Sequence, residues 1–498
     1  MHSPLYRHGY TRDQAPYHLL PFRFIQLAKD CLCLVNDVGD YCFLNPDQLS
    51  QLVHKRLDAG SEIYQNLRTK HFLVDDKTQL LLDSWVIKYR TKKSFLDGFT
   101  KLHMIVPTLR CNHSCPYCQV SRVSEDKQQY DMTTETAHAT VDLILKSSAT
   151  AITVEFQGGE PLLNFPIIKL VVQRMATERD KCGKQIDFVV ATNLSILTTE
   201  ILTFFKDYKV DVSTSLDGPA FIHDSNRPKV GNDSHSILLE NLERTRSVLG
   251  MQAVAALMTT TRLSLDYPRE IVDEYLRLGF KSIFLRPLNP YGFAVKTQQQ
   301  IGYSIEEFIA FYKKAFEYIL DLNKGGVDFQ EVFAKMLLTK MLSPFATGYV
   351  DCQSPSGAGI GAVLYNYDGN VYPADEARML AETGDKVFCM GNVMTHTHEQ
   401  LFSGDVMKRL SAVSCNENLS GCAQCAFQPY CGSDPINNYA TQGNVLGQRY
   451  SSFRCKKHLA ITSYLLSYLR AKDPEVMNIF LTWITDGTVR HMEQPVNV

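Results

Sequence analysis

The strongest constraint on the fold is an alternation of strand, loop and helix patterns between residues 103 and 286. Apolar segments rich in β-branched residues are separated by stretches with helical periodicity, for example Ala137, Val141 and Ile144. The expected strands span 103–109, 151–156, 186–192, 210–216, 251–259 and 281–285. This alternation predicts a parallel sheet covered by helices, and six such units make a partial or full βα barrel.

A loop that directly follows the first expected strand carries three cysteines. Cys111, Cys115 and Cys118 lie within eight residues, and folds of this class place their chemistry at the carboxyl ends of the strands. Three thiolates can bind three corners of an iron–sulfur cluster and leave one iron open to a ligand. Zinc is the alternative, although structural zinc usually takes four ligands. His113, inside the loop, is expected to be solvated or to support the ligands.

The second expected strand ends in Gly158-Gly159-Glu160-Pro161. The two glycines let the backbone approach a ligand closely, and the Glu160 carboxylate can accept hydrogen bonds from an ammonium group. By itself this is an ordinary turn. At the same end of the sheet as the three-cysteine loop, it indicates a ligand site.

Composition indicates the cellular compartment and excludes some classes of partner. Lys and Arg number 51 against 53 Asp and Glu, so the net charge of −2 gives no footprint for nucleic acid or an anionic membrane. No apolar run reaches the roughly 18 residues of a membrane span, and the start of the chain lacks the apolar core of a signal peptide. We therefore expect a cytoplasmic protein, in which clustered cysteines indicate metal or redox chemistry rather than disulfides. Single cysteines such as Cys31, Cys33, Cys42 and Cys182 are expected to be core residues or inert thiols.

The C-x3-C-x2-C loop followed by Gly-Gly-Glu-Pro resembles the radical S-adenosylmethionine (SAM) superfamily. Similar segments are Ala191-Thr192-Asn193, Ser215-Leu216-Asp217-Gly218-Pro219 and Asn226-Arg227. The resemblance implies a 4Fe–4S cluster on Cys111, Cys115 and Cys118 whose open iron binds S-adenosylmethionine. It also implies that this cofactor is bound by Gly158, Gly159, Glu160, Pro161, Asn193, Ser215, Asp217 and Arg227. Ser215 would lie near the ribose, and Arg227 would pair with the cofactor carboxylate.

The C-terminal cysteines resemble the SPASM extension of peptide-maturing radical enzymes. The resemblance implies one auxiliary 4Fe–4S cluster, bound by Cys422, Cys425, Cys431 and Cys455. A second auxiliary cluster of that family would need cysteines where Ala374 and Pro435 stand, and of its ligands only Cys352 remains. Cys389 and Cys415 are alternative donors, but we expect two clusters in total.

Asp375 directly follows the lost ligand position. The corresponding Asp of sulfatase-maturing relatives is a general base, so the resemblance implies a catalytic role in taking up a proton. The alternative is a turn residue in an acidic pair with Glu376.

A narrower resemblance points to the B component of the His-Xaa-Ser system of radical SAM maturases. It is carried by Phe22–Phe24, Leu34–Gly39, Arg90–Leu96, Cys118–Arg122, Asp375–Leu380 and Cys431–Pro435. Its implied partners are a precursor peptide, a second radical SAM maturase and an electron donor such as flavodoxin or ferredoxin.

The function that these resemblances imply is radical modification of a ribosomally made precursor peptide. Reductive cleavage of S-adenosylmethionine would give a 5′-deoxyadenosyl radical, which abstracts hydrogen from a side chain or an α-carbon of the peptide. One alternative is a sulfatase-maturase-like oxidase of a protein residue. A non-enzyme alternative is a zinc-bearing scaffold that binds peptides.

A chain of 498 residues is too long for one compact core. The expected fold class is α/β: a partial (β/α)6 radical SAM barrel with a small N-terminal α+β domain and a C-terminal Cys-rich SPASM-like domain. The expected segments are an N-terminal domain, the barrel, a helical linker, the SPASM-like domain and a helical tail, at 1–95, 96–300, 301–345, 346–460 and 461–498.

The N-terminal domain is expected to contain a hairpin around the turn 37–40 and a helix with Asn45 as its N-cap. Residues 22–75 could then present a strand edge to an extended leader peptide, or form a packing subdomain without a ligand. The basic run after it, which includes Lys88 and Lys92, is expected to be a solvated linker.

Overall fold

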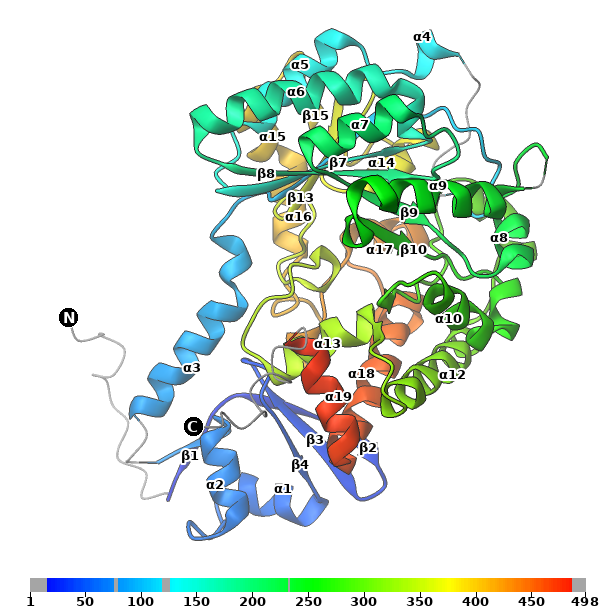
Figure 1. The fold of residues 1–498 in the computed structure, drawn as a ribbon. Coiled ribbons are helices and arrows are strands. Elements are labelled where there is room, and N and C mark those ends of the chain that lie inside the picture. The colour runs from blue at the N-terminus through cyan, green and yellow to red at the C-terminus, as the bar shows by residue number, and fades with distance from the viewer. Residues whose placement is uncertain (1–15, 76–78, 119–125, 232, 486–498) are drawn as a thin grey trace, which may run out of the picture. The chain divides into compact units, whose positions relative to one another are not determined.

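The computed structural model describes residues 16–75, 79–118, 126–231 and 233–485 (Figure 1). Gln119–Arg122 of the narrower resemblance and 486–498 of the expected tail lie outside the described residues. The chain divides into a smaller unit, 1–93 with 340–346 and 424–430, and a larger unit, 94–339 with 347–423 and 431–498. The finer segment boundaries drawn from the sequence stay predictions.

The smaller unit contains an antiparallel sheet in the order β2-β3-β4. Its strands are β2 (Phe22–Ala28), β3 (Cys31–Asn36) and β4 (Tyr41–Leu44), so the predicted hairpin around residues 37–40 is confirmed. Asn45 caps α1 (Pro46–Val53): its side chain accepts a hydrogen bond from the Gln48 amide, and the Gln48 side chain accepts one from the Asn45 amide. The predicted N-cap is therefore also confirmed.

An apolar core lies within the described part of this unit. It includes Leu34, Leu52, Leu67, Phe72 and Cys42. Cys31 and Cys33 are also buried, as predicted for core cysteines. The remaining elements are α2 (Glu62–Thr69), α3 (Gln79–Lys92), and the short strands β1 (His18–Leu19) and β5 (Leu73–Val74), which pair with each other.

The interpretation of the basic run as a solvated linker is wrong for two of its lysines. Lys92 ends α3, and its ammonium donates hydrogen bonds to the carbonyls of Lys340 (2.8 Å) and Ser343 (3.3 Å). Burial lowers the pKa of Lys92 to about 8. Lys88 forms an ion pair with Asp40 at 2.9 Å. The sequence concealed the role of Lys92 because the accepting carbonyls lie about 250 residues away along the chain.

The larger unit is built on an eight-stranded sheet in the order β10-β9-β8-β7-β6-β13-β14-β15. Strands β6 to β10 are parallel to one another, and Figure 1 shows α6 and α7 running along one side of them. The strands are β6 (Leu102–Thr108), β7 (Ala151–Gly158), β8 (Gln185–Thr192), β9 (Val210–Ser215) and β10 (Val254–Leu257). The helices that connect them include α4 (Lys127–Tyr130), α5 (Thr134–Ile144), α6 (Phe165–Cys182), α7 (Thr199–Tyr208), α8 (Ala220–Asn226) and α9 (Ser234–Leu249). The α/β barrel-like fold predicted from the alternation is confirmed.

Two details of the sheet differ from the expected barrel. The sixth expected strand is reduced to β11 (Ser282–Ile283), which pairs with β12 (Gln330–Glu331) in a separate sheet. Just after β11, the Leu285 amide donates to the buried Glu331 carboxylate at 3.2 Å, so this amide is not available for a longer ladder. On the opposite edge, β13 (Ala362–Tyr365) pairs in parallel with β6, followed by β14 (Asn370–Tyr372) and β15 (Gly391–Asn392).

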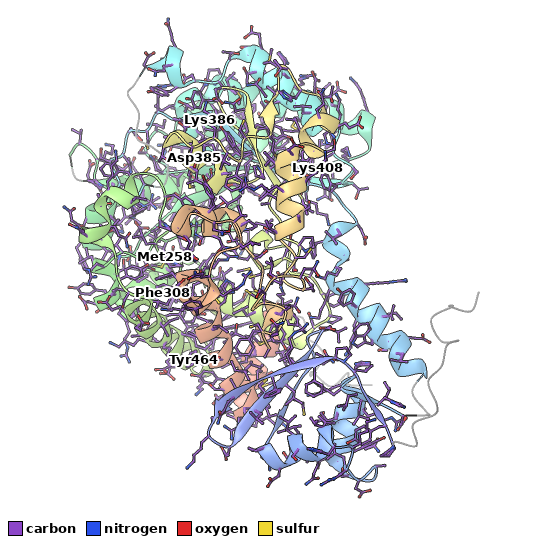
Figure 2. All side chains as sticks on the ribbon, turned by 180° about the vertical axis from the view of Figure 1, so that it is seen from behind. Met258, Phe308, Asp385, Lys386, Lys408 and Tyr464 are labelled. Atoms are coloured by element: carbon purple, nitrogen blue, oxygen red, sulfur yellow. The ribbon has the colours of Figure 1, made fainter. Side chains whose placement is uncertain are left out.

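Helices with aromatic contacts make up much of the rest of this unit. The segment expected to be a helical linker, 301–345, contains α12 (Ile305–Lys324) and α13 (Val332–Leu342). Phe316 of α12 packs against Tyr464 of α18, and both Phe308 of α12 and Tyr464 are labelled in Figure 2. The other helices are α10 (Pro268–Arg277), α11 (Phe293–Ile301), α14 (Asp375–Glu382), α15 (His398–Phe402), α16 (Asp405–Val413), α17 (Pro435–Gln442), α18 (Phe453–Ala471) and α19 (Pro474–Ile484). None of the described helices is long and apolar enough to cross a membrane.

Candidate active site

A cavity of about 340 Å³ lies at the carboxyl ends of β6, β7, β8 and β9, and is named here the barrel cavity. It brings together most of the site residues predicted from the sequence. Its lining includes Cys111, Cys115, Cys118, Gly158, Gly159, Asn193, Ser215, Arg227 and Asp375. Three other predicted residues, Glu160, Pro161 and Asp217, are buried and are not part of the lining.

The two glycines bring the end of β7 against the start of the cysteine loop. A Cβ at Gly158, where φ is +131°, would lie 2.5 Å from the Thr108 carbonyl oxygen. A Cβ at Gly159 would lie 2.2 Å from the Arg110 carbonyl oxygen. The Gly159 amide donates to the Thr108 carbonyl at 3.0 Å, and the Glu160 amide donates to the Arg110 carbonyl at 2.7 Å. Only glycine permits this approach, which positions the loop that carries the thiols.

Glu160 joins the ends of two neighbouring strands. Its buried carboxylate accepts hydrogen bonds from the Thr192 hydroxyl (2.7 Å), the Asn193 amide (2.8 Å) and the Leu162 amide (3.1 Å). Burial raises the pKa of Glu160 to about 7, against the effect of these bonds. Asn193 in turn donates from Nδ2 to Oδ1 of Asn112 in the cysteine loop at 2.9 Å. The described contacts give Glu160 a positioning role, and its predicted bond to an ammonium group stays a prediction.

A buried network holds Tyr117, which lies between the last two cysteines of the loop. The Tyr117 hydroxyl donates to Oδ2 of Asp217 at 2.5 Å, and Nε of Arg227 donates to the same oxygen at 3.0 Å. The Thr259 amide donates to Oδ1 of Asp217 at 3.0 Å. The guanidinium of Arg227 stacks 5.2 Å from the centre of the Tyr117 ring. Asp217 and Arg227 therefore bind each other, and Arg227 also lines the barrel cavity.

Of the two roles expected for His113, the solvated one is wrong, and support of the cysteine ligands stays a prediction. His113 is buried in the wall of the barrel cavity, and neither ring nitrogen has a hydrogen-bond partner among the described residues. Burial, together with the positive charges of Arg227 and Lys229, lowers the pKa of His113 to about 4. Its solvation was misjudged because the loop folds inward instead of projecting from the sheet.

Another part of the lining surrounds Asp375 with three charged residues that the sequence analysis did not single out: Arg378, Glu155 and Arg286. Oδ1 of Asp375 accepts hydrogen bonds from Nη2 (2.5 Å) and Nε (3.1 Å) of the buried Arg378. Glu155 and Arg286 also line this cavity. Burial and the nearby Asp375 charge raise the pKa of Glu155 to about 7, although Arg286 opposes the shift. Strand alternation could have predicted that Glu155 lines the cavity, because Glu155 and Gln157 of β7 point to the same face.

The C-terminal cysteines are less clearly grouped than those of the loop. Cys422, Cys431 and Cys455 belong to the larger unit, whereas Cys425 belongs to the smaller one. Across the described ranges, the loop cysteines included, no three His, Cys, Asp or Glu side chains gather as a ligand set for a single metal ion. Ala374 precedes α14 and Pro435 begins α17, while Cys352 is buried. The auxiliary cluster stays a prediction.

Comparison with known proteins decides the family. The model of the radical SAM superfamily matches residues 105–258, which carry the cysteine loop, the glycines and most of the parallel sheet. An uncharacterised protein of Methanocaldococcus jannaschii is 30% identical over 237 residues, which is 47% of this chain and 78% of that protein. The chain belongs to the radical SAM superfamily. Membership confirms the superfamily resemblance and implies a 4Fe–4S cluster with S-adenosylmethionine.

Peptide-modifying radical SAM enzymes are among the similar proteins. A cysteine-type anaerobic sulfatase-maturating enzyme of Clostridium perfringens is 24% identical over 364 residues, 69% of this chain and 92% of that protein. The structure of anSMEcpe with bound AdoMet superposes with a TM-score of 0.62 at 18% identity, covering 77% of this chain and 98% of that one. The structure of Streptococcus suis SuiB bound to its precursor peptide SuiA superposes with a TM-score of 0.52 at 12% identity, covering 88% of this chain and 99% of that one. These structures show the shared fold, and the narrower His-Xaa-Ser resemblance stays a prediction.

Proposed function

We propose that this radical SAM enzyme modifies a ribosomally made precursor peptide by abstracting a hydrogen atom. The observation that supports this most directly is that three thiols, two glycines and a guanidinium line one cavity at the strand ends. The donor set fits the group implied by the superfamily, because three thiolates suit a cluster with one open iron. Cys111, Cys115 and Cys118 would hold that cluster.

When bound, the cluster and S-adenosylmethionine supply a 5′-deoxyadenosyl radical that can take a hydrogen atom from carbon. The residues of this chain bind and orient the cofactor and the substrate. Arg227, held by Asp217, keeps a positive charge at the cavity wall that suits a carboxylate ligand. Asn193 and Ser215 add polar groups at the ends of neighbouring strands. The buried network around Tyr117 keeps these groups in place.

A peptide substrate is supported by the similarity to enzymes whose names and structures refer to peptides and sulfatase maturation. The proposed substrate is a small precursor of the His-Xaa-Ser type, as the narrower sequence resemblance implies. A second radical SAM maturase and a flavodoxin or ferredoxin complete the proposed set of partners.

A second candidate is a sulfatase-maturase-like oxidase of a protein residue. The observation in its favour is that Asp375, the general base implied by the sequence resemblance, lies in the lining of the barrel cavity. Its ion pair with Arg378 fixes the carboxylate there. Asp375 is therefore the proposed catalytic residue for proton uptake in either reaction.

The smaller unit is the proposed docking site for the leader of the precursor. β2 pairs only with β3 in the described part of the chain, so its other edge can accept an added strand. Phe24 on β2 is 54% exposed. We expect Phe24→Ala to weaken binding of the precursor without changing cofactor cleavage in its absence.

The test is an anaerobic assay with reductant, S-adenosylmethionine and the small peptide encoded beside this gene. The proposal expects release of 5′-deoxyadenosine together with a mass change in that peptide. Conversion of a sulfatase-derived peptide instead would favour the second candidate. A colourless zinc protein that releases no 5′-deoxyadenosine would contradict both and favour a binding scaffold.

A further inference from the structure

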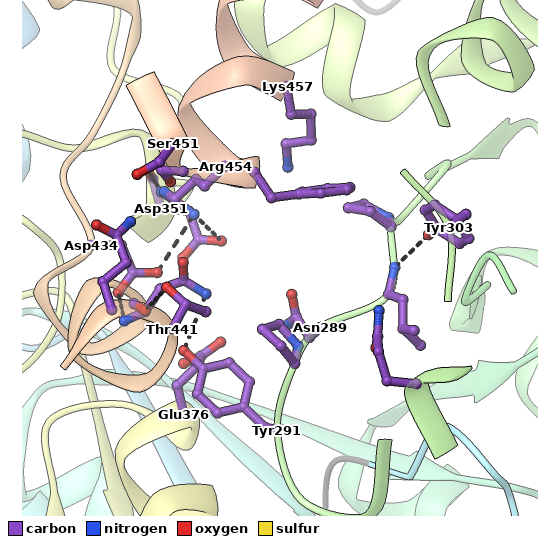
Figure 3. A pocket seen from close by; sticks show the side chains of 18 residues that line it. Asn289, Tyr291, Tyr303, Asp351, Glu376, Asp434, Thr441, Ser451, Arg454 and Lys457 are labelled. Atoms are coloured by element: carbon purple, nitrogen blue, oxygen red, sulfur yellow. Dashed lines mark hydrogen bonds and ion pairs between the residues drawn. The ribbon is translucent and has the colours of Figure 1, made fainter. Parts of the chain in front are cut away.

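A second cavity of about 280 Å³ lies within the larger unit and is named here the C-terminal cavity (Figure 3). Its wall is formed by residues 287–291, α14, α17 and the start of α18. Ligand pockets for whole small molecules usually measure about 300–1,000 Å³. This volume is large enough for one long side chain.

The charges that line this cavity do not balance. Three carboxylates, Asp351, Glu376 and Asp434, face two cations, Arg454 and Lys457. Nη1 of Arg454 lies 3.7 Å from Oδ2 of Asp351 and 3.6 Å from Oδ2 of Asp434, so one guanidinium serves two carboxylates. With all five groups ionised, one negative charge is in excess.

The excess charge falls on Glu376. Figure 3 shows Lys457 and Glu376 on opposite sides of the cavity, and the Lys457 ammonium lies 4.8 Å from the centre of the Phe333 ring. No side chain in the described part of the chain donates a hydrogen bond to the Glu376 carboxylate or pairs with it. Burial and the charges of Asp351 and Asp434 raise the pKa of Glu376 to about 8. A cation in the cavity would relieve this cost, because an opposite charge stabilises a buried carboxylate.

The cavity lies where the sequence has lost cluster ligands. Asp351 precedes Cys352, Asp434 precedes Pro435, and Glu376 follows Ala374 by two residues. Each position assigned to the second auxiliary cluster therefore stands close in sequence to a carboxylate that lines the cavity. Among the described residues that line it there is no cysteine. This site carries the donors of a cation site rather than those of an iron–sulfur cluster.

The two cavities are lined by neighbouring residues of two chain segments. Asp375 lines the barrel cavity, and the next residue, Glu376, lines the C-terminal cavity. In the same way, Arg286 lines the barrel cavity and Pro287 lines the C-terminal cavity. A peptide whose reacting residue lies in the barrel cavity can therefore place a nearby side chain in the C-terminal cavity.

We propose that the C-terminal cavity is a substrate subsite for a positively charged side chain, lysine or arginine, that lies close to the modified residue in the peptide. The Glu376 and Asp434 carboxylates accept hydrogen bonds from this side chain, and the Tyr291 hydroxyl and Asn289 lie on the same wall. The link to the modified residue rests on the proposed function. The preference of the cavity for a cation does not rest on the proposed function.

The test uses ligand-observed NMR to measure how tightly small probes bind to the reconstituted full-length protein. The probes are N-acetyl-lysine methylamide, its norleucine counterpart and its glutamate counterpart. We expect the wild type to bind the lysine probe at least about tenfold more tightly than the norleucine probe, as charge-assisted hydrogen bonds predict. Glu376→Gln should remove most of this preference. Glu382→Gln, on the same helix but outside the cavity lining, should keep it within about twofold.

Equal binding of the lysine and norleucine probes by the wild type would overturn the proposal, as would an unchanged preference in Glu376→Gln. If that variant does not fold, Asp434→Asn decides, because asparagine keeps the oxygen that accepts a hydrogen bond from the Asn437 amide at 2.9 Å. Iron lost from the wild type on Cys352→Ala would place a cluster here and also contradict it. A precursor that is not modified, with the lysine preference intact, would overturn the proposed function alone.

Discussion

The barrel cavity and the C-terminal cavity belong to one unit and differ in how their charges are balanced. In the barrel cavity, Arg227 is paired with Asp217 and Arg378 with Asp375, the charge of Arg286 opposes that of Glu155, and three thiols supply the donors. In the C-terminal cavity, no described lining residue is a cysteine, and the Glu376 carboxylate is left over. In the barrel cavity, the pairing of charges leaves the thiols as the reactive groups. In the C-terminal cavity, the carboxylate without a partner itself selects a ligand.

The largest expected difference between the two cavities is in iron. Two 4Fe–4S clusters would give about eight irons per chain after anaerobic reconstitution. Cys422→Ala should lose roughly half of that iron, because it removes a ligand of the single auxiliary cluster. Cys352→Ala is the matched control and should lose none. About twelve irons in the wild type would show that the degenerate site still binds a cluster.

The position of the cysteine loop should depend strongly on Gly159. Alanine there would bring its Cβ to 2.2 Å from the Arg110 carbonyl oxygen and push the loop away from β7. We expect Gly159→Ala to slow formation of 5′-deoxyadenosine about 100-fold, since a displacement of about 1 Å has that effect on positioned groups. Gly60→Ala is the control, because its nearest neighbour would lie 3.6 Å away. Equal rates in the two variants would contradict the positioning role of Gly159.

The charge pairing behind the barrel cavity can be tested at Asp217. Asp217→Asn leaves Arg227 without its counter-charge, and we expect the free energy of unfolding to fall by about 3 kcal/mol. The exposed pair of Lys169 and Glu200 serves as the control: Glu200→Gln should cost less than about 1 kcal/mol. Chemical denaturation measures both. A small effect of Asp217→Asn would mean that the pair is not needed for the fold.

The smallest expected effect is the pH dependence of stability due to Glu155. Its pKa of about 7 in the folded state exceeds the ordinary value of 4.5, so the folded state holds this proton more tightly than the unfolded state. Stability from this group is complete below about pH 4.5 and falls as pH rises through about 7. Glu155→Gln should therefore raise the free energy of unfolding by about 1 kcal/mol at pH 8 and by less at pH 5.5. A gain that is equal at both pH values would contradict this.

Local patterns predicted much of the fold. The cap at Asn45, the hairpin before it and five strands of the parallel sheet follow from residue type and periodicity over short distances. The sixth strand was overestimated because the Leu285 amide bonds to Glu331, a residue far along the chain. The three-cysteine loop and Gly158-Gly159 were found because their spacing is local.

The rest of the candidate site depends on contacts that no local pattern contains. The hydrogen bond from Tyr117 to Asp217, which is 100 residues away along the chain, and the burial of His113 are products of tertiary packing. The imbalance of charge around Glu376 brings together Asp351, Asp434 and Arg454, which are distant in sequence. Sequence analysis could name such residues singly, but it could not predict which of them share a cavity.

Replacing Cys111, Cys115 and Cys118 together by alanine tests the central claim most directly. In an anaerobic assay with S-adenosylmethionine and reductant, the account predicts no 5′-deoxyadenosine from this variant, while about four irons remain at the auxiliary site. Cofactor cleavage that continues in the triple variant would contradict the assignment of these three cysteines.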